Sequence, residues 1–378
     1  MIYLDYSATT PVSFDVLDSY NKTTKEFIGN PNSLHRLGSK SNELLRSATK
    51  QISDLLKVME SEIFFTSGAT ESNNMALIGV ALANHKKGNH ILVSKLEHPS
   101  IYAICDYLTS IGFEVEYINN DNEGLIDFDD LKNKMRQDTI LVSVNAVNSE
   151  TGVRQPLKFI RQIIRKENQE TIFHSDMTQA IGKTSICLND VDMASFSAHK
   201  IYGPKGIGLL YKNSKIRIVP LEYGSGKSSN LKPGTPALPL IVAFSKAIRI
   251  ALTDIDKREH FISRLNEKIC TSLNKYPDVV VNSTKHSIPH ILNVSVLGLK
   301  PETFLHALEE HEVYISTNTA CSSGEISSSV MAIYNDEKRA ASTLRISLSH
   351  LTTTDEINKF LDYFDTVYKK LKFWFSAI

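Results

Sequence analysis

The sequence predicts an α/β protein with a mainly parallel sheet, followed by a smaller α+β unit. Between about residues 41 and 235, short β-branched apolar runs alternate with stretches of helical periodicity. Strands that alternate with helices form parallel sheets covered by helices on both faces. After residue 235 the helices lengthen and strands become fewer, and a chain of 378 residues is long enough for two or three domains.

The first part of the chain supplies the elements of the predicted parallel sheet. Leu44, Ala48, Ile52 and Leu56 recur at helical spacing, and an apolar run over 63–66 follows them. Further runs of strand character occupy 91–94, 115–118, 140–144, 172–175, 193–196 and 208–211. Helical patterns separate most of these runs, at 73–82, 101–111, 128–135 and 157–166. Pro156 precedes the last of these helices and suits its first turn.

The second part of the chain predicts the smaller unit. We expect a long helical stretch over 240–273, strands at 292–296 and 344–349, and helices at 303–310 and 355–371. Residues 12–255 would then form a large domain, and 1–11 with 256–378 a small one. Two polar loops stand out, 224–235 and the Ser-rich 316–329, and we expect both to be mobile and functional.

The composition indicates a soluble, cytoplasmic protein. Lys plus Arg (42) balance Asp plus Glu (42), which argues against direct binding to nucleic acid or to an anionic membrane. No 18-residue apolar run occurs, and the N-terminus has no signal-peptide pattern. The four cysteines lie far apart without any CxxC pair, so we expect neither a metal site nor a disulfide framework.

The segment 195–208, SFSAHKIYGPKGIG, contains the most informative residue, Lys200. This lysine lies just past a predicted strand end, follows Ser and His, and precedes a Gly/Pro turn. That setting suits a Schiff-base lysine held on rigid backbone. For Lys200 taken alone, an exposed lysine at a turn is the commoner interpretation.

Other polar residues follow predicted strands in the same way. SGATES at 67–72 opens a helix, where free N–H groups and the Thr70 hydroxyl suit a phosphate, although a simple helix cap is commoner. Asp176 could hold a pyridine nitrogen protonated, or cap the next helix. His98 could stack on a flat ring, although a single histidine is more often structural. With Asn148 and Lys200, these residues converge on the edge where open α/β sheets bind ligands.

Together with YLDYSATTP at 3–11, GNP at 29–31 and TLRIS at 343–347, these segments resemble a known family. The chain resembles the class V group of fold type I pyridoxal-phosphate enzymes, and within it the NifS/IscS-type cysteine desulfurases. The resemblance runs nearly end to end, and its SxHKxxGPKGxG pattern is specific to this group. It implies a fold type I PLP-dependent transferase fold, pyridoxal 5′-phosphate as cofactor, and conversion of L-cysteine to L-alanine.

The resemblance also implies a role for each site residue. Lys200 would carry the cofactor and later move protons at the substrate's Cα. The cofactor ring would stack on His98 and contact Asp176 at its nitrogen and Gln179 at its hydroxyl oxygen. The phosphate would be held by Ala69, Thr70, Ser197, His199 and, across a homodimer, Thr235. Asn148 would contact the cofactor and the substrate. Arg345 would form a bidentate contact with the substrate carboxylate.

The resemblance implies that Cys321, in the 316–329 loop, is the nucleophile. Its thiolate would take the sulfur of L-cysteine as a persulfide, with His98 and Lys200 as the other catalytic residues. Cys105 and Cys270 lie in apolar helical patterns and are interpreted as core residues, and Cys187 as a loop or strand-edge residue. The 24 positions between Cys321 and Arg345 resemble the long-loop subgroup, in which sulfur passes to an acceptor protein for iron–sulfur assembly or tRNA thiolation.

One loop departs from the family pattern, and alternatives stay open. In 224–235 the family's acidic residue is missing and Lys232 replaces an arginine, so a bidentate contact would be lost. The rival enzyme activities are selenocysteine lyase, cysteine sulfinate desulfinase and aminotransferase. A catalytically weak cofactor-binding scaffold is the further alternative. The Gly-Lys-Ser at 226–228 is not a nucleotide-binding loop, because Leu221 stands where its first glycine would be.

Overall fold

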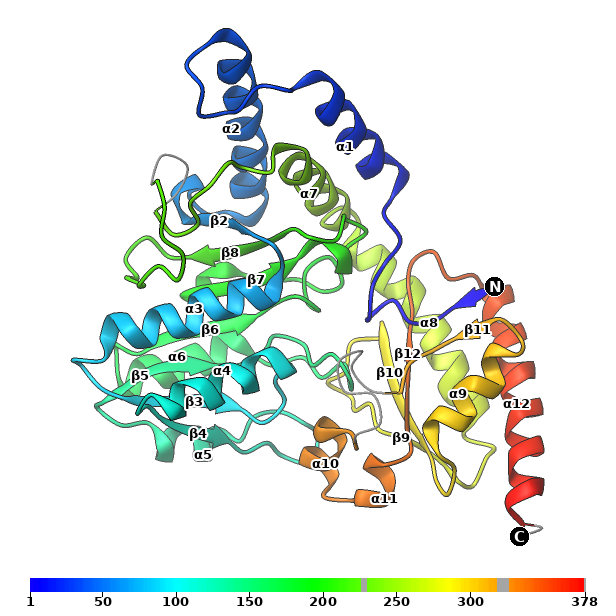
Figure 1. Cartoon of the computed structure of the whole chain (residues 1–378). Helices are drawn as coiled ribbons and strands as arrows, with labels where there is room; N and C mark the ends of the chain where they lie inside the picture. Colours follow the sequence, from blue (N-terminus) through cyan, green and yellow to red (C-terminus); the bar gives the residue numbers. More distant parts are fainter. Residues whose placement is uncertain (226–229, 318–325, 377–378) are drawn as a thin grey trace.

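The computed structural model describes residues 1–225, 230–317 and 326–376, and its main feature is a seven-stranded sheet (Figure 1). The strand order is β2-β8-β7-β6-β5-β3-β4. Strands β4, β3, β5, β6 and β7 are parallel, whereas β8 runs antiparallel to both β7 and β2. The predicted mainly parallel sheet is therefore confirmed. The strands are β2 (Ile63–Thr66), β3 (His90–Ser94), β4 (Glu114–Ile118), β5 (Thr139–Ser143), β6 (Ile172–Asp176), β7 (Met193–Ser197) and β8 (Gly208–Lys212).

Helices cover both faces of this sheet, because successive strand side chains point to opposite sides. Leu92 and Phe173 pack with α2, α6 and α7 on one face, whereas Ile91 and Ile172 pack with α3 and α4 on the other. Two-sided burial explains the continuous apolar runs of the strands. The helices are α1 (Phe14–Glu26), α2 (Arg36–Leu56), α3 (Ala69–Asn84), α4 (Pro99–Ser110), α5 (Phe128–Lys134), α6 (Leu157–Glu167) and α7 (Leu238–Ala251), with 3₁₀ turns η1 (Glu60–Glu62), η2 (Leu188–Asp190) and η3 (Ala198–Lys200).

A separate apolar core surrounds a three-stranded antiparallel sheet, β12-β10-β9, and the parallel pair β1-β11. This core contains Leu4 from the N-terminus together with Phe304 and Phe360. Its elements are β1 (Ile2–Tyr3), α8 (Ile255–Leu273), β9 (Val279–Val281), β10 (Ile291–Val296), α9 (Pro301–Glu309), β11 (Val313–Tyr314), α10 (Ser328–Tyr334), α11 (Glu337–Ala340), β12 (Thr343–Ser347) and α12 (Thr354–Ser376). The domain division at 12–255 stays a prediction, which this second core supports.

Two predictions about the elements need correction. The long helical stretch expected over 240–273 is divided into two helices, because the chain forms α7 and α8 with a break at Asp254. Asp254 has a left-handed φ of 56°, and such a residue cannot continue a right-handed helix. Helix α1 was not predicted, because only Val16 and Thr23 of its residues are buried and it carries no apolar stripe.

The described ranges contain neither a helix suited to crossing a membrane nor a cluster of side chains suited to a metal ion. No helix there combines the length and the apolar character that crossing a membrane requires. The same ranges contain no group of three or more His, Cys, Asp or Glu side chains that could hold a metal ion.

Candidate active site

One cavity of about 470 Å³ gathers most of the residues predicted for the site. It lies at the carboxyl-terminal edge of the large sheet, which is where open α/β sheets bind ligands. Its walls come from the ends of β6 and β7, the starts of α3 and α4, the N-terminal segment and β12. Of the predicted residues, those that line it are Ala69, Thr70, His98, Asp176, Gln179, Ser197, His199, Lys200 and Arg345.

The start of α3 forms an anion-binding end of this cavity. Gly68 is its N-cap residue and offers no side chain to the first N–H groups, so these groups are available to a ligand beside Ala69 and Thr70. Gly208 of β8 packs against this turn so closely that a Cβ there would lie 2.6 Å from Gly68 Cα. The turn is thus held directly against the sheet.

Asp176, the last residue of β6, presents a buried carboxylate to the cavity. Its Oδ2 accepts a hydrogen bond from Asn73 Nδ2 at 2.9 Å, and its Oδ1 accepts one from the Thr178 N–H at 2.9 Å. Hydrogen bonds to a carboxylate favour its charged form. The carboxylate therefore suits a protonated ring nitrogen of a flat heteroaromatic ligand.

His98 is the N-cap residue of α4 and faces the same cavity. Its Nδ1 accepts a hydrogen bond from the Ser100 N–H at 3.1 Å, so the neutral ring carries its proton on Nε2. Burial lowers the pKa of His98, Lys200 adds to this effect and Asp176 opposes it. The site therefore holds a flat, uncharged imidazole with an Nε2–H donor.

The amine of Lys200 lies against the N-terminal segment. Its Nζ donates to the carbonyl oxygens of Ser7 at 2.6 Å and Ala8 at 2.7 Å. Thr10 fastens this segment by donating from Oγ1 to the His199 carbonyl oxygen at 2.9 Å. The sequence motif at 3–11 carried the family resemblance, but only the structure shows that it forms a wall of the site.

Arg345 is fully buried in β12. Its Nη2 forms an ion pair with Asp5 Oδ1 at 2.9 Å, and its Nη1 donates to the Ser149 carbonyl oxygen at 3.1 Å. Among the residues that the structure describes, the buried Nε has no hydrogen-bond partner. An unsatisfied buried donor is costly, so this guanidinium suits a ligand carboxylate.

Asn148 does not line the cavity, contrary to the prediction. Its Oδ1 accepts from the N–H groups of Glu150 at 3.0 Å and Thr151 at 2.8 Å, and its Nδ2 donates to the Leu96 carbonyl oxygen at 2.9 Å. The amide is therefore engaged inside a turn. The next residue, Ser149, lines the cavity instead.

Two further predicted residues are not found among those that line this cavity, Thr235 because it lies elsewhere and Cys321 because the structure does not describe it. Thr235 lines a different cavity, and its Oγ1 accepts a hydrogen bond from Asn30 Nδ2 at 3.4 Å. Its contact with the phosphate of another subunit stays a prediction. Cys321 belongs to 318–325, which lies outside the described residues, so its role stays a prediction as well.

Sequence reasoning missed two buried titratable groups beside the site. Glu97 accepts a hydrogen bond from the Asn145 N–H at 2.6 Å, and burial together with the charge of Asp176 raises its pKa to about 8. Lys183 donates from Nζ to Gln179 Oε1, and burial lowers its pKa to about 7. Glu97 precedes His98 directly and Lys183 follows Gln179 by four positions, but nothing local signals their burial.

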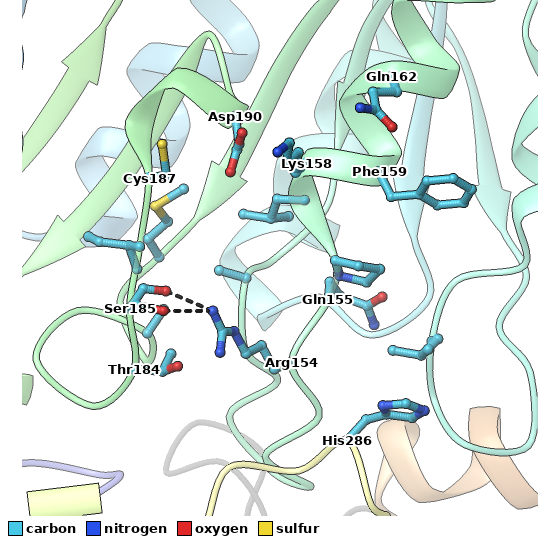
Figure 2. Close-up of a pocket in the computed structure, with 17 residues that line it drawn as sticks. Arg154, Gln155, Lys158, Phe159, Gln162, Thr184, Ser185, Cys187, Asp190 and His286 are labelled. Carbon is cyan, nitrogen blue, oxygen red and sulfur yellow. Dashed lines mark hydrogen bonds between the residues drawn. The ribbon is translucent and has the colours of Figure 1, made fainter. Parts of the chain in front are cut away.

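The cysteines that the structure describes lie elsewhere. Cys187 is exposed and lines a second cavity, of about 540 Å³, together with the start of α6 and His286 (Figure 2). Cys105 is buried in α4, and Cys270 is half-buried in α8. None of these three cysteines lines the cavity that contains Lys200.

The residues of the Lys200 cavity fit pyridoxal 5′-phosphate. The uncapped start of α3 fits a phosphate, the Asp176 carboxylate a ring nitrogen, and the Lys200 amine an aldehyde. Arg345 lines the same cavity and would supply a positive charge for a substrate carboxylate.

Comparisons with known proteins agree with this fit. Residues 2–360 match the family model of the class-V aminotransferases. A NifS/IcsS protein homolog of Lactobacillus delbrueckii subsp. bulgaricus is 39% identical over 376 residues, 98% of this chain and 97% of that protein. A cysteine desulfurase IscS of Buchnera aphidicola subsp. Schizaphis graminum is 40% identical over 366 residues, 94% of this chain and 90% of that protein.

Two solved structures of NifS-like and cysteine-bound proteins are also similar to this chain. A NifS-like protein superposes with a TM-score of 0.92 at 33% identity, and the match covers 98% of this chain and 99% of that one. The structure described as SspA in complex with cysteine superposes with a TM-score of 0.82 at 32% identity, covering 93% of this chain and 100% of that one.

Proposed function

The chain belongs to the class-V aminotransferase family, and from this membership we propose that it is a pyridoxal 5′-phosphate-dependent cysteine desulfurase. The observation that carries the proposal is the single cavity shared by Lys200, Asp176, Arg345 and the start of α3. Relatives named cysteine desulfurase that match nearly the whole chain, and a structural neighbour solved with cysteine, support L-cysteine as the substrate.

Each wall of the cavity has a part in holding the cofactor. Pyridoxal phosphate, when bound, supplies an electron sink for bonds at the substrate's Cα. Asp176 would keep the ring nitrogen protonated, and His98 would cover the ring with a neutral imidazole. The phosphate would be held by Ala69 and Thr70 at the start of α3, and by Ser197 and His199.

The substrate would be oriented by Arg345. Asp5 and the Ser149 carbonyl oxygen hold its two Nη atoms, so the guanidinium presents a fixed charge to the carboxylate of L-cysteine. The Lys200 amine lines the same cavity, and it would take and return the proton at the substrate's Cα.

Cys321 is the proposed sulfur acceptor. Its thiolate attacks the substrate sulfur, so that the Cβ–S bond breaks, an S–S bond forms, and the carbon takes a proton to leave as L-alanine. The described residue Ser316 supports this role, because its backbone pairs with that of Arg345 at 2.7 and 3.1 Å. An extended chain spans at most about 3.6 Å per residue, so a residue five positions from Ser316 lies within roughly 18 Å of it.

A second copy of the chain would complete the enzyme. Exposed apolar side chains cluster on α1, the start of α2 and the chain around them: Val12, Phe14, Leu17, Ile28, Leu34 and Leu37. Many exposed apolar side chains within one stretch of chain, here 12–37, are typical of an interface. Thr235 adjoins it through Asn30, which supports the proposed contact between Thr235 and the partner's phosphate.

The persulfide would leave the enzyme on a separate acceptor protein, for iron–sulfur assembly or tRNA thiolation. The formal net charge of this chain is zero, whereas binding to RNA depends largely on positive charge. This supports the proposal that the acceptor protein, and not this chain, contacts RNA. We place the protein in the cytoplasm, where thiols stay reduced.

Alanine and sulfide release from L-cysteine test the proposal. Cys321→Ala should keep the visible absorbance of the bound cofactor and lose sulfide release, whereas Cys187→Ala, the matched control, should keep both. A wild-type rate in Cys321→Ala would rule out the persulfide step. Absorbance that persists in Lys200→Ala would contradict the role of Lys200, and turnover of selenocysteine or cysteine sulfinate but not L-cysteine would favour a rival activity.

A further inference from the structure

Lys183 is a buried lysine whose partner is an uncharged amide. It is 8% exposed, and its Nζ donates to Gln179 Oε1. Among the ion pairs of the described residues, none involves Lys183. Lysines are rarely buried without a carboxylate, because desolvating the amine is costly. Because burying this amine is costly, we expect it to have a function, and its hydrogen-bond partner Gln179 indicates where that function lies.

Gln179 connects Lys183 to the catalytic lysine. Its Nε2 donates to the Ser7 carbonyl oxygen at 3.0 Å, and the same oxygen accepts from Lys200 Nζ at 2.6 Å. The two ends of a glutamine amide are almost identical in shape, so neighbours decide which end points where. Lys183 always offers N–H groups, and it therefore engages the oxygen end of Gln179.

We propose that Lys183 is a positioning residue, which turns the Gln179 amide so that its Nε2–H group faces the ring-hydroxyl end of the cofactor. This inference rests on the proposed function. Nε2 carries two hydrogens, of which one is bonded to Ser7, and because Gln179 lines the cavity, the other would be available to a ligand there. A donor at that place favours the ionised ring oxygen, whereas a reversed amide would oppose it with a carbonyl.

The hydrogen bond from Lys183 to Gln179 does not require that the lysine be charged. Burial first, and then the charges of Lys200 and Arg345, lower its pKa to about 7, and His199 and His290 also face it. Both protonation states of the amine carry N–H groups, so the observed hydrogen bond to Gln179 Oε1 can form on either side of neutral pH.

The test is a double-mutant cycle read by the pH titration of the bound cofactor's visible absorbance. Lys183→Met keeps an unbranched side chain out to the ε position and removes the donor. We expect it to move the titration midpoint by about one unit, which is a tenfold change in the protonation equilibrium of the bound cofactor. In a Gln179→Met background the same substitution should add nothing, because residues that act as a unit are not additive.

Two further variants make the result decisive. Lys183→Arg retains a side chain with N–H donors only and should keep the wild-type midpoint, and Lys166→Met, on the exposed side of α6, should have no effect. Equal shifts with and without Gln179, or an unchanged midpoint in Lys183→Met, would overturn the inference. A wild-type protein that develops no visible absorbance with added cofactor would instead overturn the proposed function.

Discussion

Asp5 and the buried Arg345 form a partly buried ion pair at the site, although 340 positions separate them in the sequence. Asp5 holds Nη2, the Ser149 carbonyl oxygen holds Nη1, and Nε is left for a ligand. The pair thus fixes the direction of the guanidinium before a substrate arrives. A preoriented guanidinium loses little conformational freedom on binding a carboxylate.

Asp5→Asn should therefore weaken substrate binding more than turnover. We expect the KM for L-cysteine to rise about tenfold, equivalent to about 1.4 kcal/mol, with kcat within about twofold of wild type. Steady-state kinetics measure both constants, and Asp106→Asn on the exposed face of α4 is the control. A lower KM would show that Asp5 competes with the substrate instead of positioning Arg345.

Between elements, Lys232 contacts the first turn of α3 in a way that the sequence did not reveal. Lys232 replaces the family's arginine, yet its Nζ pairs with Glu71 in the first turn of α3 and with Glu222 at 2.8 Å. Burial raises the pKa of Glu71, but hydrogen bonds from Lys232 and the Ser67 N–H outweigh burial and lower it. An ionised Glu71 lines the cavity beside the expected phosphate, and Lys232 compensates its charge.

Lys232→Met should leave that carboxylate uncompensated and weaken cofactor binding. A partly exposed ion pair contributes about 1 kcal/mol, so we expect roughly a fivefold rise in the cofactor's Kd, measured by fluorescence titration. Adding Glu71→Gln should restore the wild-type Kd, and Lys232→Arg should preserve it. If Glu71→Gln fails to rescue Lys232→Met, charge compensation is not the function of this pair.

At the scale of the whole molecule, the exposed apolar surface on α1 and α2 is the feature that the isolated chain leaves unexplained. Leu34 is fully exposed, and Phe14 and Ile28 are 83% and 76% exposed. Figure 1 shows α1 and α2 at one end of the molecule, far from the C-terminus. A second copy that covers this surface would also bring Thr235 toward the partner's site.

Ile28→Glu combined with Leu34→Glu should therefore produce a monomer. Both side chains are exposed, so the folded chain loses no core packing, while two charges enter the proposed interface. Size-exclusion chromatography with light scattering gives the mass, and we expect desulfurase activity to fall because Thr235 no longer reaches its partner. Leu351→Glu, at an exposed position outside this surface, should stay dimeric. A dimeric double variant would exclude this surface as the interface.

The sequence by itself determined the strands of the large sheet, the strand-end positions of Lys200, Asp176 and His98, and the family. These features are readable because strand and helix periodicity, turn residues and motif spacing are local properties. Local patterns failed where a bend is short, as at Asp254, and where one position decides which side chain faces inward, as at Asn148 and Ser149.

Only the tertiary structure decided how distant segments complete the site. It places the carbonyl oxygens of Ser7 and Ala8 on Lys200, Asp5 on Arg345, and the buried amine of Lys183 on Gln179. The physical reason is that burial and pairing of a charge depend on what packs around it, and the packing partners here come from both ends of the chain.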